Sequence, residues 1–286
     1  MSRVAIVTDS TADLMPDLVA AAGLRVVPLY VRFGAEEFRV GVDLSIEQFW
    51  ARMLAPDAPF PTTAAPSPGT FRETFEGLFA EGADAIVCPT IGSKLSATFQ
   101  SATLAAEALP GREIHVIDTR STSMSTGIPA LLAAEMAAAG VAAAEIAAAV
   151  VARLPDVDLF VAIDTLEYLR KGGRMSAART AIGTVLSVKP IITVVDGLVT
   201  MAEKPRTRAK ARERVLELIS ERPVERLAVI HTPTSSREEV EAFRDALVAR
   251  IPGGVDPANV SIALLGASTG PHLGPGLMGA AFMRRH

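Results

Sequence analysis

The sequence predicts an α/β protein with two lobes, each built from mainly parallel strands flanked by helices. Short apolar runs recur along the chain without polar alternation, as in strands buried on both faces of a parallel sheet. Each run is followed by a polar turn and then by a helical pattern, which is the order of βαβ units. A new series of such units begins near Pro155.

We therefore place the first lobe at residues 1–155 and the second at residues 156–286. A chain of 286 residues, 49% of them hydrophobic, can bury one large core or two ordinary ones. Ligands of open α/β folds bind outside the carboxyl ends of the strands. We expect a ligand to be enclosed at or near the cleft between the lobes.

In the first lobe, local signals mark the ends of the helices. Ser45 and Gln48 form a capping box, and Ser67-Pro68 is typical of an N-cap followed by a first helical residue. The segment 56–68 contains five prolines and is predicted to be a loop. The expected strands are residues 4–8, 24–33, 85–88 and 114–117, and the expected helices are 14–22, 46–54, 69–81, 95–108 and an alanine-rich pair over 128–154.

In the second lobe, the clearest local signal is Asp196-Gly197 between two β-type runs, which predicts a hairpin over residues 191–202. The basic segment 170–174 contains two glycines and is predicted to be a loop. The other expected strands are residues 159–163, 227–231 and 260–265, and the expected helices are 166–169, 176–185, 207–221 and 236–249.

Composition argues against several classes of protein. With 28 basic and 32 acidic residues the net charge is −4, so no nucleic-acid role is expected. The single Cys88 excludes an internal disulfide and fits a reduced cytoplasmic setting. We expect no export signal at the N-terminus, because its apolar run is too short. The segment 128–154 carries charges and is divided by Gly140, so no stable membrane insertion is expected.

The segment Ile91–Ala102 has the order strand, polar loop and helix N-terminus. Backbone N–H groups at such a junction lie at the positive end of a helix dipole, where an anion binds well. The hydroxyls of Ser93, Ser96 and Thr98 can donate to the same anion, and Ser96 can also be an N-cap. Capping alone would equally account for these hydroxyls.

Two further segments are candidates for a binding site. Thr62 and Thr63 lie between prolines and form a stiff, hydroxyl-bearing segment, although turn chemistry alone would also place them there. Gly266–Gly276 follows an expected strand, and its glycines, Gly274 among them, permit close backbone approach around His272. A lone histidine is more often an ordinary core or surface residue.

Other chemistries lack their signatures in this sequence. No G-x-S-x-G elbow, phosphate-binding P-loop or metal-ligand spacing of histidines occurs, so neither a metal nor a cofactor is expected. Asp9 and Asp13 could be paired carboxylates, but more simply Asp9 ends a strand and Asp13 caps the next helix. Basic residues cluster at 170–174 and 204–212, which fits either a solvated face or an acidic or phosphate-bearing partner.

At these residues the sequence resembles the DegV family, bacterial fatty-acid-binding proteins of the FakB type. The resemblance spans nearly the whole chain, and the specificity lies in seven motifs in the right order. They are V-T-D-S-T-A-D-L at 7–14, T-x-x-P-S-P at 63–68, S-K-L-S-x-T-x-Q-S-A at 93–102, L-R-K-G-G-R at 169–174, K-P-I at 189–191, R-T-R at 206–208 and H-x-G-P-G at 272–276.

The resemblance implies a protein that encloses one long-chain fatty acid and is not itself an enzyme. Thr63, Ser96 (or Ser93) and His272 would hold the carboxylate, with Thr62 and Gly274 beside them. The family presents its acyl group to a separate fatty-acid kinase that makes acyl-phosphate for phospholipid synthesis. The arginines that the resemblance links to that partner are Arg174 and Arg206, and we add Arg170 and Lys171 of the same basic cluster as candidate partner-binding residues.

This chain departs from the family pattern at Ala64, Ala65 and Leu273, where the family usually has polar or small residues. Two other functions remain open at this point. One is an enzyme acting on a small phosphorylated or carboxylated metabolite, with His272 as general base and Ser96 or the Asp9 turn assisting. The other is a ligand sensor that docks a partner through Arg170, Arg174 and Arg206.

Overall fold

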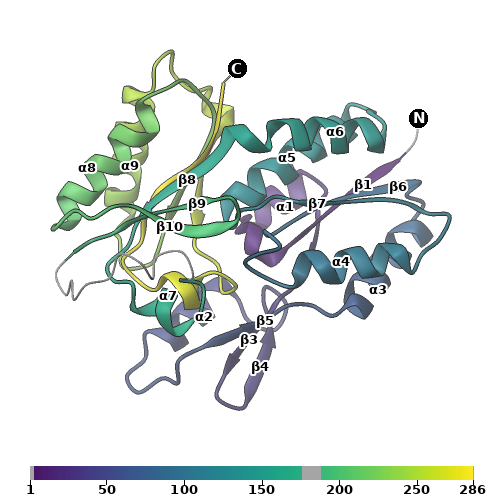
Figure 1. Ribbon diagram of the computed structural model, residues 1–286, viewed down its shortest axis with the longest axis horizontal. Coiled ribbons are helices and arrows are strands. Elements are labelled where there is room, and N and C mark those ends of the chain that lie inside the picture. The colour runs from purple at the N-terminus through teal and green to yellow at the C-terminus, as the bar shows by residue number, and fades with distance from the viewer. Residues whose placement is uncertain (1–2, 176–187, 286) are drawn as a thin grey trace. The chain divides into compact units, whose positions relative to one another are not determined.

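The computed structural model describes residues 3–175 and 188–285, and the expected helix over 176–185 lies outside them. The chain divides into two compact units (Figure 1). The first unit contains Met1–Pro155 and Gly266–Ser268, and the second contains Asp156–Leu265 and Thr269–His286. The predicted lobe boundary falls at the same place, but Gly266–Ser268, which we assigned to the second lobe, lies with the first unit. The reason is that Gly266 donates to Asp13 and Ser268 shares a hydrogen bond with Ser10.

A four-stranded parallel sheet forms the centre of the first unit. All six residues of β6 are buried, which explains why its sequence is apolar without alternation. The strand order is β2 (Arg25–Val27), β1 (Val4–Asp9), β6 (Ala85–Thr90) and β7 (Glu113–Asp118).

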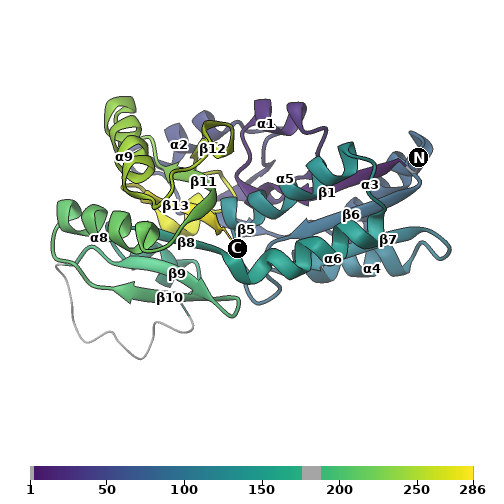
Figure 2. The same cartoon turned by 90° about the horizontal axis from the view of Figure 1, so that it is seen from above.

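Helices cover both faces of this sheet (Figures 1 and 2). On one face Phe71 and Phe75 of α3 and Ala102 of α4 pack against Val7 and Ile86. On the other face the alanine-rich helices pack against Ile6 and Val87. The helices are α1 (Pro16–Ala21), α3 (Pro68–Ala80), α4 (Thr98–Glu107), α5 (Met124–Ala138) and α6 (Ala143–Arg153), with the short turns η1 (Ser10–Ala12) and η2 (Leu154–Asp156).

The segment 56–68, predicted to be a loop, contains a strand, β5 (Thr62–Ala64), and the prediction is corrected there. This strand pairs antiparallel with β3 (Tyr30–Phe33), which also pairs with β4 (Glu36–Arg39). β5 is an edge strand of three residues, so the flanking prolines interrupt no ladder. Helix α2 (Ile46–Met53) begins with the predicted capping box, and its Phe49 packs on Phe33 of β3 with ring centroids 5.9 Å apart.

The second unit is built on a six-stranded sheet in which only β11 and β12 pair in parallel. The last strand, β13, lies between β8 and β11 and is antiparallel to both. The α/β class is therefore confirmed, while the expected parallel arrangement holds only for the first sheet. The strand order is β10 (Leu198–Glu203), β9 (Ile191–Val195), β8 (Val157–Ala162), β13 (Met278–Arg284), β11 (Val224–His231) and β12 (Val260–Leu264).

The predicted hairpin of β9 and β10 lies at the edge of this sheet (Figure 2). Asp196 and Gly197 both have positive φ, 50° and 76°, as the expected two-residue turn requires. Strand β13 was missed by the sequence analysis. It consists of an apolar run whose six buried residues pair with β8 and β11.

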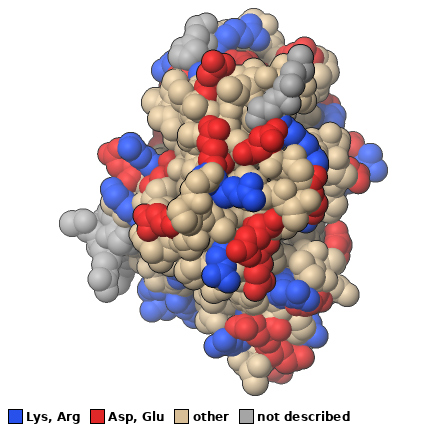
Figure 3. All heavy atoms as spheres, turned by 90° about the vertical axis from the view of Figure 1, so that its right-hand side faces the viewer, with Lys and Arg blue, Asp and Glu red and all other residues tan. Residues whose placement is uncertain are grey.

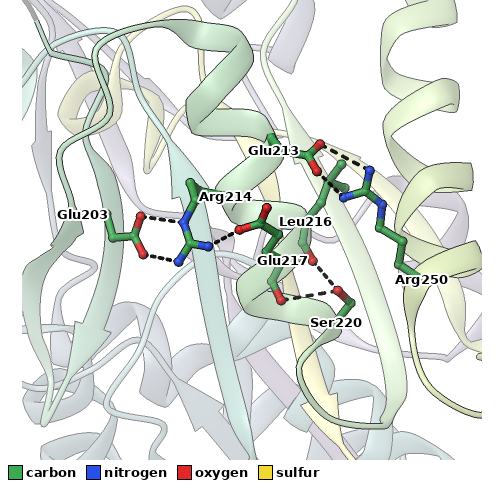
Figure 4. A network of polar contacts seen from close by, with 7 residues as sticks. All are labelled: Glu203, Glu213, Arg214, Leu216, Glu217, Ser220 and Arg250. Carbon is green, nitrogen blue, oxygen red and sulfur yellow. Dashed lines mark hydrogen bonds and ion pairs between the residues drawn. The ribbon is translucent and has the colours of Figure 1, made fainter.

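Helices α8 (Arg208–Ser220) and α9 (Arg237–Arg250) pack on the second sheet through Val215, Ile219, Phe243 and Leu247. Figure 4 shows how ion pairs join α8 to its neighbours. Arg214 contacts Glu203 of β10 and Glu217 of α8, and Arg250 of α9 contacts Glu213. The short helices α7 (Glu167–Lys171) and α10 (Gly270–Leu273) and the turn η4 (Pro257–Asn259) complete this unit within the described residues.

Gly279 in β13 tests the packing of the central strand. A Cβ there would lie 2.1 Å from the Phe160 carbonyl oxygen and 2.5 Å from Val161 Cα, both backbone atoms of β8. Gly279→Ala should therefore destabilise the protein by about 3 kcal/mol, as overpacked cores do. The control is Gly77→Ala in α3. A Cβ at this position meets nothing within 4 Å, so the substitution should stabilise the protein by up to ~1 kcal/mol. Urea unfolding measures both, and equal stabilities of the two variants would contradict the packing described.

Candidate ligand-binding site

The parallel strands β1, β6 and β7 all end at the same edge of the first sheet, and a polar loop follows each. Asp9, the last residue of β1, is fully buried. Its carboxylate accepts hydrogen bonds from Thr11 N (2.9 Å), Thr11 Oγ1 (2.5 Å) and Ile91 N (2.8 Å). Burial raises the pKa of Asp9, and these hydrogen bonds oppose the rise. Asp9 thus joins the loop after β1 to the loop after β6.

Asp13 joins two more loops at this edge. Its carboxylate accepts from Ser123 Oγ at 2.6 Å, after β7, and from Gly266 N at 3.1 Å. A Cβ at Gly266 would lie 2.5 Å from Asp13 Oδ1, so a glycine is needed there. The prediction that Asp13 caps the next helix is wrong. The backbone of Asp13 has the left-handed conformation (φ 51°), and α1 begins after Met15 without a side-chain cap.

The loop carrying Ser96 ends before α4, which begins at Thr98 instead of the predicted Leu95. The reason is a turn in which Leu95 N and Ser96 N both bond to the Gly92 carbonyl. Ser96 is therefore not the N-cap residue. Its Oγ accepts from Thr98 N at 3.3 Å and shares a hydrogen bond with Thr98 Oγ1 at 2.8 Å. Both hydroxyls remain beside the N-terminus of α4.

Ser93 is positioned differently from Ser96. Its hydroxyl donates to Asp118 Oδ2 at 2.5 Å, and its N–H donates to Asp118 Oδ1 at 3.1 Å. An anion at Ser93 would meet the carboxylate of Asp118 and be repelled by it. Of the two serines, the geometry favours Ser96 as an anion ligand.

Thr62 and Thr63 follow one another in β5, opposite Arg32 and Val31 of β3. Successive side chains in a strand point to opposite faces. Thr63 is half-buried and Thr62 is exposed. Thr63 is therefore the threonine whose side chain lies on the covered side of this small sheet.

In the second unit, the structure brings together two segments that the sequence analysis singled out. Helices α7 and α10 pack on each other, so the basic segment 170–174 lies against the His272 segment. Arg170 and Lys171 belong to α7, so the predicted loop is corrected at these two residues. A Cβ at Gly172 would lie 2.1 Å from His272 Nδ1, and one at Gly274 would lie 2.2 Å from the Tyr168 ring. Arg174 Nη1 donates to the Gly172 carbonyl at 2.7 Å and is itself half-buried.

This environment makes His272 neutral near pH 7. Burial lowers the pKa of His272 to about 4, and the positive charge of Arg174 adds to the effect. Burial also lowers the pKa of Arg174. A neutral imidazole can donate one hydrogen bond to an anion but brings no charge.

The Gly274–Gly276 segment that follows His272 is fixed by a polar cluster. Gly276 N donates to Thr232 Oγ1 at 3.0 Å, and a Cβ at Gly276 would lie 2.2 Å from Asp164 Oδ2. Asp164 accepts from Arg208 Nε at 2.7 Å and pairs with Lys189 Nζ at 3.0 Å. Two members of the 204–212 basic run are thus engaged within the protein, Arg208 with Asp164 and Arg212 with Glu239 at 3.2 Å.

The candidate partner-binding residues differ in their exposure. Arg170 and Lys171 are exposed at the end of α7, and Lys171 pairs with Glu167 at 2.7 Å. Arg206 is exposed just before α8.

On the face shown in Figure 3, acidic and basic side chains are interspersed, which does not resemble a nucleic-acid-binding surface.

Within residues 3–175 and 188–285, no group of three His, Cys, Asp or Glu side chains could hold a metal ion. None of the helices in these ranges is long and apolar enough to cross a membrane.

The first unit also contains a cavity of about 390 Å³ that the sequence analysis missed. It is formed by η1, α1, β2 and residues 40–47, so no single sequence segment signals it.

A family model described as "Uncharacterised protein, DegV family" matches residues 3–285. The chain belongs to the DegV family. A DegV domain-containing protein of Streptomyces coelicolor is 37% identical over 290 residues, which covers 100% of both chains. The predicted family is confirmed.

Solved structures of DegV proteins have the same fold over the whole length. "Fatty Acid Binding of a DegV family Protein from Thermus thermophilus" is 33% identical, with a TM-score of 0.87 and coverage of 99% of this chain and 100% of that one. "DegV, a fatty acid binding protein from Bacillus subtilis" is 30% identical, with a TM-score of 0.88 and 100% coverage of both. A stearic-acid-binding protein from Eubacterium ventriosum is 26% identical, with a TM-score of 0.88 and coverage of 99% and 98%.

The depressed pKa of His272 predicts a pH dependence of stability. The unfolded chain protonates this histidine near pH 6.5, but the folded protein does so only near pH 4. The unfolded state therefore binds more protons between these values, and stability falls as the pH drops from 6.5 to 4. In His272→Gln, the loss of unfolding free energy between pH 7 and pH 4 should be smaller by about 2–3 kcal/mol.

Denaturant unfolding at a series of pH values measures this difference. Arg174→Gln removes the neighbouring charge, so it should raise the pKa of His272 and reduce the pH dependence partially. An identical pH dependence in the parent protein and His272→Gln would show that His272 is not held neutral as described.

Proposed function

We propose that this DegV-family protein binds one long-chain fatty acid, whose carboxylate is held by Thr63, Ser96 and His272. The observation that carries the proposal is the whole-length similarity to DegV proteins of known structure that are described as fatty-acid-binding. The local chemistry supports it. Ser96 and Thr98 present hydroxyls beside the N-terminus of α4, whose first turn contains no acidic residue.

The proposed carboxylate ligands are neutral donors. Hydroxyls, helix N–H groups and a neutral imidazole all stabilise the ionised acid, so binding does not require its protonation. Thr62 and Ser93 lie beside Thr63 and Ser96 on the same two segments, but the proposal gives them no direct contact with the carboxylate, and Gly274 only shapes the segment after His272. Affinity would come mainly from the tail, since about 0.8 kcal/mol per buried CH₂ gives a C16 chain on the order of 10 kcal/mol before association costs.

We further propose that the protein is a cytoplasmic carrier that presents the acyl carboxylate to a separate fatty-acid kinase for phospholipid synthesis. Arg170, Lys171, Arg174 and Arg206 are the proposed contacts with the kinase. The exposure of Arg170 and Arg206 supports this assignment, because exposed guanidinium groups can bind carboxylates or phosphates of a partner. No cofactor is part of the proposal.

The enzyme alternative finds less support. A general base works best when its pKa lies near the working pH. With a pKa of about 4, His272 is a weak base at neutral pH. The same property suits a hydrogen-bond donor to a ligand that must stay ionised.

Ser96→Ala tests the head-group assignment. Loss of one hydroxyl donor to a charged ligand should weaken palmitate binding by about tenfold, equivalent to ~1.4 kcal/mol. The matched control is Ser93→Ala, whose hydroxyl already donates to Asp118, and whose affinity should stay within about twofold of the parent protein. Fluorescence displacement and native mass spectrometry measure both. Unchanged affinity in Ser96→Ala would remove this serine from the proposed site.

Kinase reconstitution tests the carrier role. With a bacterial fatty-acid kinase and ATP, the loaded protein should yield acyl-phosphate. Arg170→Glu and Arg206→Glu should lower the rate at limiting carrier by about fivefold or more, because charge reversal costs encounter rate and affinity. Fatty-acid binding should be unchanged. Arg237→Glu, at a side chain 92% exposed in α9, is the charge-matched control. Tight fatty-acid binding without acyl-phosphate formation by any kinase would favour the sensor.

A further inference from the structure

The loop after β7 holds an exposed arginine in a backbone conformation that favours glycine. Arg120 has a φ of 54°, in the left-handed region that is strained for residues with a side chain. Strain of this kind persists where the surrounding structure imposes it, and it is common at functional sites. Because a glycine would suit this backbone better, local structure does not account for the arginine side chain.

Two contacts fix the backbone of Arg120 beside the loop that carries Ser96. Asp118 Oδ1 accepts from both Arg120 N (2.9 Å) and Ser93 N (3.1 Å), so one carboxylate oxygen joins the two loops. A Cβ at Gly92 would lie 2.9 Å from the Arg120 carbonyl carbon, so the two chains approach closely there. The Gly92 carbonyl in turn accepts from Ser96 N at 3.2 Å. Arg120 therefore contacts the residue that closes the turn at Ser96.

The side chain of Arg120 is available for a ligand. Within residues 3–175 and 188–285, its guanidinium makes neither an ion pair nor a hydrogen bond, since its one hydrogen bond comes from the backbone N–H. Lys94, exposed on the Ser96 loop, is the other basic residue in the loops after β1, β6 and β7, which are residues 10–15, 91–97 and 119–123. These two cations outnumber the carboxylate of Asp118, whose oxygens already accept hydrogen bonds.

The proposed function brings a phosphoryl group to this edge of the sheet. When a kinase makes acyl-phosphate, a carboxylate oxygen bonds to the terminal phosphorus of a nucleoside triphosphate. The bond from that phosphorus to its bridging oxygen breaks, and the nucleoside diphosphate leaves with the electron pair. The bound head group then carries about two negative charges instead of one. The proposed carboxylate ligands are neutral and cannot balance this added charge.

We propose that Arg120 binds the phosphoryl group of acyl-phosphate formed at Ser96, with Lys94 as a second cation beside it. The inference rests on the proposed function. An arginine donates two parallel N–H bonds to phosphate oxygens, which suits it to this role. The free fatty acid is held by neutral donors and does not require Arg120. Loss of Arg120 therefore weakens the binding of acyl-phosphate and spares the binding of the fatty acid.

A stable analogue of the product tests this inference. In the phosphonate analogue of palmitoyl phosphate, a methylene replaces the bridging oxygen, so the phosphoryl group is not hydrolysed. The parent protein should bind both palmitate and this analogue. Arg120→Gln should weaken binding of the analogue by about tenfold or more, while palmitate stays within about twofold. Arg112→Gln removes an exposed arginine at the opposite end of β7 and should change neither affinity. Isothermal titration calorimetry measures both ligands.

Arg120→Gly repeats the test and relieves the backbone strain. Glycine suits a φ of 54°, so this variant should melt at the temperature of the parent protein or above, yet lose affinity for the analogue as Arg120→Gln does. If the parent protein does not bind palmitate, the proposed function fails. If it binds palmitate but not the analogue, or if both Arg120 variants bind the analogue as the parent does, only the inference fails. Equal losses for the two ligands would also overturn it, because Arg120 would then serve the carboxylate and not the phosphoryl group.

Discussion

Two buried carboxylates hold together the loops at the carboxyl edge of the first sheet. Asp9 bridges the loops after β1 and β6, and Asp13 bridges the loop after β7 and the segment at Gly266. Burying a carboxylate lowers the stability of the fold unless hydrogen-bond donors surround it, so removing one donor would destabilise the protein. The arrangement even holds Ser123 at φ 57° and ψ −148°, a region that non-glycine residues rarely occupy, because its hydroxyl donates to Asp13.

Elements with strong local signals were predictable from the sequence. The capping box at Ser45 and Gln48, the Asp196-Gly197 turn and the apolar run of β6 all depend on residues close in the chain. The place of β13 was not predictable. An apolar run indicates a buried strand but not its neighbours, and the pairing of β13 with β8 is set by contacts across the whole second unit.

At the candidate site, the residue types were predictable but their partners were not. The sequence shows hydroxyls at Ser93 and Ser96, yet only the fold reveals that Ser93 donates to Asp118 and that Ser96 pairs with Thr98. Likewise a run of basic residues does not disclose that Arg208 binds Asp164. A hydrogen-bond partner distant in sequence depends on tertiary placement. The cavity, built from four separate segments, could not be predicted for the same reason.

The electrostatics of the proposed head-group site bear on what the protein can do with its ligand. At neutral pH a histidine with a pKa of about 4 is uncharged. Its one N–H can donate a hydrogen bond but is not transferred, so a carboxylate beside it stays ionised. An ionised carboxylate is the form that can attack a phosphoryl group. Under the proposed function, the protein keeps its ligand in the nucleophilic form, and the separate kinase would supply the phosphoryl group that this carboxylate attacks.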